Sequence, residues 1–179
     1  MKRIGALFVL LGLLLAGCAV QKPEHKQYTA TFLTLFDTVT TIVGRDESET
    51  AFHAKAQAVH DALLEYHQLF DIYEEYDGIS NLKTINDHAG ISPVKVDSKI
   101  IELLVDCRYF CDVTQGSVNP AMGSVLGLWH DARSDGIDDP VNAYLPDENA
   151  LNSAAQHISF DDVVIDEKAS TVYLSDPLL

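Results

Sequence analysis

The residues best suited to bind a phosphate group lie in the stretch 116–129. A glycine turn leads there into Asn119 and Pro120, and we expect a helix to begin at this pair and to end on the only tryptophan. Asn119 would be the N-cap, and Pro120 suits the first turn, where a missing N–H costs nothing. Gly123 and Gly127 would leave one helix face almost bare. Such a helix start attracts a phosphate or pyrophosphate. The alternative is a close packing contact that needs glycine for room, and the local pattern alone favours it.

Two cysteines lie four residues apart, Cys107 and Cys111, within an expected helix over 98–113. One interpretation is a redox pair or half of a metal site. The other is a pair of small, buried helix residues. We favour the second, because no further cysteine pair or histidine cluster in the sequence completes a site. No metal ligand is therefore assigned.

Three of the seven histidines repeat at intervals of seven residues, namely His53, His60 and His67. Two helical turns separate neighbours, so they share a face but lie too far apart along the axis to bind one ion. His130 follows Trp129 and is the histidine most suited to a site. No Ser-His-Asp or Cys-His arrangement emerges from the spacing.

The elements expected to position these residues predict an α+β fold, a mixed or antiparallel sheet packed with helices. Residues 28–43 read as two strands joined near Phe36-Asp37, because they are rich in Thr, Val, Ile and Phe. An apolar stripe predicts a long helix over 48–73. Further elements are expected as a short helix over 82–86, an extended piece over 92–96, a helix over 147–157, and strands over 163–166 and 171–174. Strands and helices without regular βαβ alternation favour the α+β class.

The first seventeen residues resemble a lipoprotein signal peptide. Lys2 and Arg3 precede an apolar run over 4–15 that is short for a membrane span, and small residues then lead to Cys18. We expect Cys18 to carry the lipid, residues 18–27 to form a tether, and residues 28–179 to form the domain. The expected location is the extracytoplasmic face of the cell membrane, held there by acyl chains.

The chain carries a formal net charge of −15, and removal of Lys2 and Arg3 with the leader would make it more negative. Nucleic-acid binding requires basic patches that neutralise phosphates, so we exclude a nucleic-acid partner. A negatively charged ligand can still bind where backbone amides, helix dipoles or a metal oppose the overall field.

Four stretches, in order, resemble the FAD:protein FMN transferases, the ApbE-type flavin transferases: 35–40, 76–86, 116–130 and 146–174. The resemblance extends from about residue 28 onward. It implies flavin contacts by Phe36, Tyr76, Ser117, Val118 and Asn119. Many family members carry methionine, aspartate and glycine where this chain has Phe36, Asn119 and His130.

The resemblance also implies the reaction: FMN moves from FAD to a threonine of a target flavoprotein, with Mg²⁺ assisting the phosphoryl transfer. In the family, an Asp-Leu-Gly and Lys-Gly segment with the metal ligands follows the strand matched by 171–174. We therefore expect this chain to be an N-terminal portion, truncated at its C-terminal side. The Mg²⁺ ligands would lie beyond residue 179, and the portion would be inactive alone. The alternative function is a membrane-tethered flavin-binding lipoprotein without transferase activity.

Overall fold

The computed structural model describes residues 25–179, which form two compact units. The first unit comprises the described residues up to Asp61, and the second is Ala62–Leu179. Helix α2, Glu49–Phe70, begins in the first unit and ends in the second. The expected signal peptide and Cys18 lie outside the described residues.

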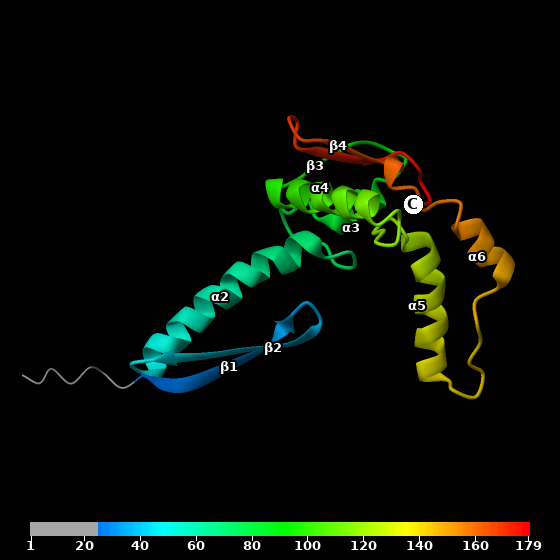
Figure 1. Cartoon of the computed structure of the whole chain (residues 1–179). Coiled ribbons are helices and arrows are strands. Elements are labelled where there is room, and N and C mark those ends of the chain that lie inside the picture. Colours follow the sequence, from blue (N-terminus) through cyan, green and yellow to red (C-terminus); the bar gives the residue numbers. More distant parts are fainter. Residues whose placement is uncertain (1–24) are drawn as a thin grey trace, which may run out of the picture. The chain divides into compact units, whose positions relative to one another are not determined.

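In the first unit, a β-hairpin packs against the first part of α2. Strands β1, Lys26–Leu35, and β2, Thr38–Asp46, pair antiparallel. This confirms the predicted strand pair. Figure 1 shows the hairpin beside the first part of α2. Ala30 of β1 forms a buried cluster with Phe52 and Ala56 of the helix, and the alternate strand residues Tyr28 and Phe32 pack against it.

Phe36 and Asp37 form the two-residue turn of this hairpin, since Leu35 pairs with Thr38. Both turn residues have positive φ, 53° and 50°. Two-residue turns with positive φ at both positions follow the right-handed twist of the strands. Asn and Gly adopt this conformation readily, whereas a bulky residue such as phenylalanine does so at a cost.

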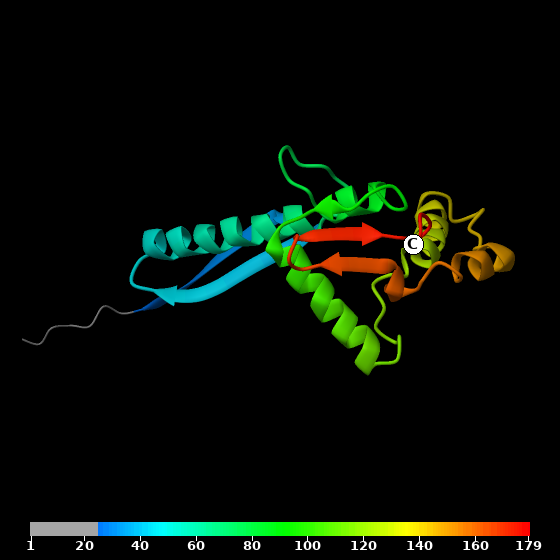
Figure 2. The ribbon, with the colours of Figure 1, turned by 90° about the horizontal axis from the view of Figure 1, so that it is seen from above.

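The second unit contains a three-stranded antiparallel sheet in the order β3-β5-β4. Its strands are β3, Val94–Lys95, β4, Val163–Asp166, and β5, Thr171–Leu174. Helices α3, Leu82–Asp87, and α4, Ser98–Val113, belong to the same unit. Figure 2 shows β4 and β5 side by side. Ile100 of α4 and Val172 of β5 are fully buried in the core of this unit. The predicted α+β class is confirmed.

Helix α5, Gly123–Asp138, differs at both ends from the sequence-based expectation. Pro120 and Ala121 form a turn, and the N-cap position falls on Met122, which provides no side-chain cap. The prediction of Asn119 as the N-cap was wrong, because its carboxamide accepts a hydrogen bond from the N–H of Ala121 and stabilises the turn instead.

The predicted end of this helix at Trp129 was also wrong. The residues after Trp129 continue α5 to Asp138, with Ala132 buried on one face. Pro140 follows two residues later, and residues before a proline disfavour helical geometry. Helix α6, Glu148–Ala154, begins after the N-cap Asp147, whose side chain accepts from the N–H of Ala150.

Candidate functional site

Tyr76 is held where the chain leaves α2. Its hydroxyl donates to Oδ2 of Asp71 at 2.7 Å and lies 3.3 Å from Nε2 of His67. Burial opposes the ionisation of Asp71. The hydrogen bonds from Tyr76 and from the N–H groups of Tyr73 and Glu74 outweigh that effect and lower the pKa of this carboxyl. The Tyr76 ring is therefore oriented by an ionised carboxylate.

Asn81 fastens the segment between Tyr76 and α3, and its side chain is fully buried. It forms a capping box with Thr84: its Oδ1 accepts from the backbone N–H of Thr84, whose side chain accepts from the N–H of Asn81. Its Nδ2 also donates to the carbonyl of Glu74 at 2.8 Å. Sequence reasoning did not assign Asn81 to the site, although an Asn three residues before Thr84 is an N-cap signal.

The turn after α4 carries Ser117, Val118 and Asn119. Gly116 has φ +80°, a left-handed conformation that glycine adopts without steric cost. The N–H of Val118 donates to Oγ1 of Thr114 at 3.0 Å, and that hydroxyl donates to the carbonyl of Phe110 at 2.6 Å. Ser117 and Val118 are exposed to solvent at this turn.

Asn119 ties the turn to a distant segment. Its Nδ2 donates to the carbonyl of Ile158 at 2.8 Å, while its Oδ1 accepts from Ala121. An amide has two N–H donors and two acceptor lone pairs, so one donor and one lone pair remain for a ligand. A second hydrogen bond joins the start of α5 to the end of α6, since the hydroxyl of Ser124 donates to the carbonyl of Ala154 at 3.0 Å.

His157 and Asp176 connect the same region to the last strand. Nδ1 of His157 lies 2.6 Å from Oδ2 of Asp176, and the N–H of Leu178 donates to Oδ1. The hydrogen bonds from Leu178 and His157 lower the pKa of Asp176. This pair, which sequence reasoning did not find, fastens residues 175–179 beside the turn that carries Asn119.

An apolar cavity of about 210 Å³ lies at the start of α5. Pro120, Ala121 and Gly123 line one part of it, and core side chains such as Ile85 and Phe160 line another. An apolar ring fits such a lining better than a phosphate does. Pro120 of this lining directly follows Asn119, one of the predicted flavin contacts.

Of the five predicted flavin contacts, the structure places Phe36 in the first unit and the other four in the second. Ser117, Val118 and Asn119 are consecutive in one turn. Tyr76 is held by Asp71, at the end of α2, so two elements of the second unit position these four residues.

Gly123 and Gly127 of α5 do not serve a close packing contact within the described residues. A Cβ atom added at Gly127 would meet nothing within 4 Å, and one at Gly123 would approach only the carbonyl of Leu179, at 3.9 Å. The packing interpretation was therefore wrong for the described structure. The backbone at both positions is accessible.

The titratable side chains do not assemble a metal centre within residues 25–179, where no group of three or more His, Cys, Asp or Glu is placed to hold an ion. His53 faces Glu49, His60 faces Asp61, and His67 faces Tyr76. The ring of His130 lies 6.4 Å from that of Tyr73. The described residues therefore do not fit a Mg²⁺ site on their own.

Cys107 and Cys111 are free thiols that pack, half-buried, against the core of the second unit. Burial and the neighbouring charge of Asp106 raise the pKa of Cys107. This packing agrees with the interpretation of the pair as buried helix residues.

The comparison with known proteins identifies the class. A family model described as the ApbE family matches residues 36–178, and the chain belongs to this family. The FAD:protein FMN transferase of Treponema pallidum (strain Nichols) is 31% identical over 115 residues, which cover 60% of this chain and 29% of that protein.

Two solved structures share the fold. The ApbE protein from Thermotoga maritima superimposes with a TM-score of 0.64 at 23% identity, covering 83% of this chain and 45% of that one. The apo flavinyl transferase ApbE from Pseudomonas stutzeri gives 0.61 at 13% identity, covering 89% and 50%. The chain spans about half the length of these two structures, and its match spans less than a third of the Treponema relative.

Proposed function

We propose that this chain contributes the flavin-positioning part of an FAD:protein FMN transferase. The observation that carries the proposal is the family match over residues 36–178, which includes all five predicted flavin contacts. The 31% identity to a relative named FAD:protein FMN transferase supports the same activity. FAD would be the flavin donor, and a threonine of a target protein would be the acceptor.

The backbone of Phe36 supports a role in binding. A phenylalanine at φ 53° is strained, and its side chain is 44% exposed at the tip of the hairpin. Strain of this kind concentrates at functional sites, because selection for stability alone favours Asn or Gly in such a turn. We assign Phe36 a contact with the flavin ring.

Ser117, Val118 and Asn119, in the turn that precedes α5, would contact the flavin directly. The exposed Ser117 hydroxyl and the remaining donor of Asn119 would hydrogen-bond polar atoms of the flavin, and Val118 would contact its apolar surface. Tyr76, oriented by Asp71, would stack on the ring or hydrogen-bond to it.

In the transfer reaction, the threonine oxygen forms a bond to the phosphorus of the FMN moiety while the pyrophosphate bond to AMP breaks. The hydroxyl proton passes to a base, and AMP leaves. Charge builds on the phosphate oxygens, so donors fixed in advance lower the barrier. The described residues do not form a metal site, and we assign them positioning of the flavin only.

The test is FAD binding by the full chain, followed through quenching of flavin fluorescence. Phe36→Ala is expected to weaken binding about tenfold, or about 1.4 kcal/mol, as the loss of one aromatic contact. Leu33→Ala, on the same hairpin and 72% exposed, is the matched control and is expected to bind as the wild type does. Equal FAD binding by the wild type, Phe36→Ala and Leu33→Ala would show that Phe36 does not contact the flavin.

A second measurement addresses the chemistry. The full chain is incubated with FAD, Mg²⁺ and a threonine-containing target peptide, and mass spectrometry follows addition of FMN. Covalent FMN on the threonine supports the transferase. Flavin binding without transfer agrees both with a flavin-positioning part that is inactive alone and with the membrane-tethered flavin-binding lipoprotein, whereas a folded chain that neither quenches nor transfers flavin contradicts both.

We further propose that Cys18 carries a lipid that holds the protein on the extracytoplasmic face of the cell membrane. The proposal is supported by the sequence leading to Cys18. No helix within residues 25–179 is long and apolar enough to cross a bilayer. Labelled fatty acid should be incorporated into the wild type and not into Cys18→Ser. Labelling of both would place the lipid elsewhere.

A further inference from the structure

In the first unit, the hydroxyl of Thr34 lies beside an imidazole that a carboxylate holds in place. Oγ1 of Thr34, on β1, is 3.4 Å from Nε2 of His60, on α2. Nδ1 of the same ring is 3.1 Å from Oδ1 of Asp61, the next residue of the helix. A hydroxyl, an imidazole and a carboxylate in this order can activate the hydroxyl as a nucleophile. We call these three residues the Thr34 triad. Thr34 and His60 are 26 residues apart, so sequence spacing did not indicate it.

The hydrogen bonds around His60 select the tautomer that can accept a proton from Thr34. Hydrogen bonds from His60 and from the side-chain amide of Gln57 lower the pKa of Asp61, which is therefore ionised at neutral pH. An ionised carboxylate only accepts hydrogen bonds, so Nδ1 of His60 carries the donated hydrogen and Nε2 carries a lone pair. The ring also packs against Phe32, with centroids 4.5 Å apart, and the His60 side chain is only 14% exposed. Contacts to β1 and to its own helix therefore hold the ring.

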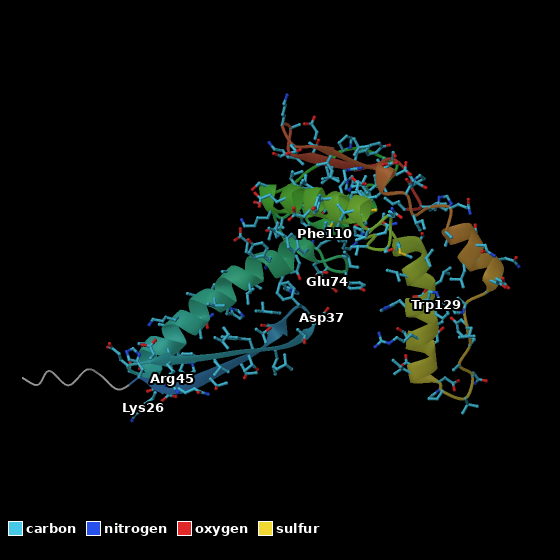
Figure 3. The ribbon with its side chains drawn as sticks, viewed as in Figure 1. Lys26, Asp37, Arg45, Glu74, Phe110 and Trp129 are labelled. Atoms are coloured by element: carbon cyan, nitrogen blue, oxygen red, sulfur yellow. The ribbon has the colours of Figure 1, made fainter. Side chains whose placement is uncertain are left out.

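Thr34 lies at an irregularity of the hairpin. The register of β1 and β2 shifts between Phe32 and Leu35, so two residues of β1, one of them Thr34, oppose a single residue of β2. A β-bulge of this kind re-aims a side chain, and bulges are over-represented next to active sites. Thr34 is exposed, and Figure 3 shows Asp37, three residues further along, at the tip of the hairpin. The hydroxyl is therefore held near an exposed end of the hairpin.

A second threonine of the same strand lacks such a base. Thr31 is also exposed, but its hydroxyl lies 3.5 Å from the hydroxyl of Thr41. An unaided hydroxyl is a weak nucleophile at neutral pH, whereas an adjacent base activates it. The strand therefore offers a direct comparison between two exposed threonines, of which Thr34 has an imidazole beside it.

We propose that Thr34 is an acceptor of FMN, so that this member of the ApbE family is also a substrate of the transfer reaction. The inference rests on the transfer reaction proposed above, which joins FMN to a threonine hydroxyl. In this role the chain is the acceptor, and the transferase that acts on it binds FAD and Mg²⁺.

The step balances within the Thr34 triad and FAD. Oγ1 of Thr34 forms a bond to the phosphorus of the FMN moiety, and the bond from that phosphorus to the bridging oxygen of AMP breaks. The hydroxyl proton moves to Nε2 of His60, and AMP leaves with the bonding electron pair. Asp61 stabilises the imidazolium that forms. The long hydrogen bond from Thr34 is expected to shorten when the phosphorus approaches, as catalytic hydrogen bonds often do on substrate binding.

The test offers the full chain as the acceptor to the FAD:protein FMN transferase of Treponema pallidum, with FAD and Mg²⁺. Mass spectrometry of the digested chain should find FMN on Thr34. Thr34→Val removes the hydroxyl and keeps the branched shape, so it should lose the modification, whereas Thr34→Ser should keep it. Thr31→Val is the matched control on the same strand and should be modified as the wild type is.

His60→Gln separates a base from a structural contact. Glutamine can still hydrogen-bond to Thr34 but cannot take its proton. The maximal rate of modification should fall about a hundredfold, as for the loss of a general base, while the KM for the chain stays unchanged. A rise in KM alone, or a rate equal to that of the wild type, overturns the assignment of His60 as the base.

Asp61→Asn gives a second measurement if His60→Gln disturbs the hairpin. The Asp61 side chain is 65% exposed, so the change leaves the packing of the hairpin intact. The rate should also fall, because the ring loses the carboxylate that fixes its tautomer. An unchanged rate overturns the Thr34 triad.

Two further measurements separate this inference from the proposed function. A threonine-containing target peptide in the same reaction verifies that the added transferase is active. FAD binding by the chain alone, followed through fluorescence quenching, tests the proposed function independently. An active transferase that leaves Thr34 unmodified, or that modifies the wild type and Thr34→Val equally, overturns the inference whether or not the chain binds FAD.

Discussion

Both sheets of this protein were predicted from their sequences, but they pack on buried clusters of very different size. In the first unit, strands of 10 and 9 residues pack on a cluster with three buried residues, Ala30, Phe52 and Ala56. In the second unit, strands of 2 to 4 residues rest on a cluster with eleven buried residues. A two-stranded sheet is marginal by itself, so strand length is a poor guide to stability. The comparison indicates that the second unit holds most of the folding free energy.

Ile100→Ala should have the largest effect, because Ile100 is fully buried in the core of the second unit. The cavity and the lost apolar burial should lower the free energy of unfolding by about 2 to 5 kcal/mol. Urea unfolding followed by circular dichroism measures the change. Ile91→Ala, at an exposed site in the same unit, is the control. Similar urea midpoints for Ile100→Ala and Ile91→Ala would contradict the assignment of Ile100 to the core and of Ile91 to the surface.

Phe52→Ala probes the smaller cluster. Phe52 is 4% exposed and stacks with Tyr28 at 5.7 Å between ring centroids. Its loss should cost about 1.5 to 3 kcal/mol. Hydrogen exchange should accelerate at β1 and β2 while the amides of β4 and β5 keep their protection. Equal loss of protection in both sheets would mean that the two units unfold together, and the comparison would fail.

Asn81→Ala should have a smaller effect in the second unit, about 1 to 2 kcal/mol, because it removes the cap of α3 and leaves the carbonyl of Glu74 without its donor. Thermal unfolding measures the loss. Asn81→Asp keeps an acceptor for the Thr84 N–H and should recover part of the stability. If Asp recovers nothing, the bond to Glu74 is the dominant contribution.

Asp176→Asn should have the smallest effect and depend on pH. The folded-state pKa of Asp176 is lowered by its bonds from Leu178 and His157, so its contribution is complete above the unfolded pKa of about 3.9 and is lost as pH falls through the folded value. The urea midpoints of wild type and variant should differ at pH 7, and the difference should shrink as the pH falls below the unfolded pKa of about 3.9. A difference that stays the same size as the pH falls through the folded pKa would contradict the assignment.

Much of the fold follows from local sequence, and the bounds of α4, β4 and β5 were predicted to the residue. Apolar and β-branched residues within these elements, with polar residues at their ends, specify such boundaries locally. The start of α5 could not be predicted in this way, because Asn119 bonds to Ala121 and to Ile158, which is 39 residues away. The pair of His157 and Asp176 likewise depends on tertiary contact. The predicted flavin contacts came from the family resemblance and stay predictions.

The two thiols of α4 have a consequence for the oxidation chemistry of the protein. Thiol–disulfide exchange proceeds through the thiolate, and burial of Cys107 reduces the thiolate fraction at neutral pH. A bond between Cys107 and Cys111 would also require α4 to distort, since residues four apart on a regular helix lie near the upper limit of disulfide geometry. Air oxidation of these cysteines should therefore be slow while α4 is folded, and unfolding should accelerate it.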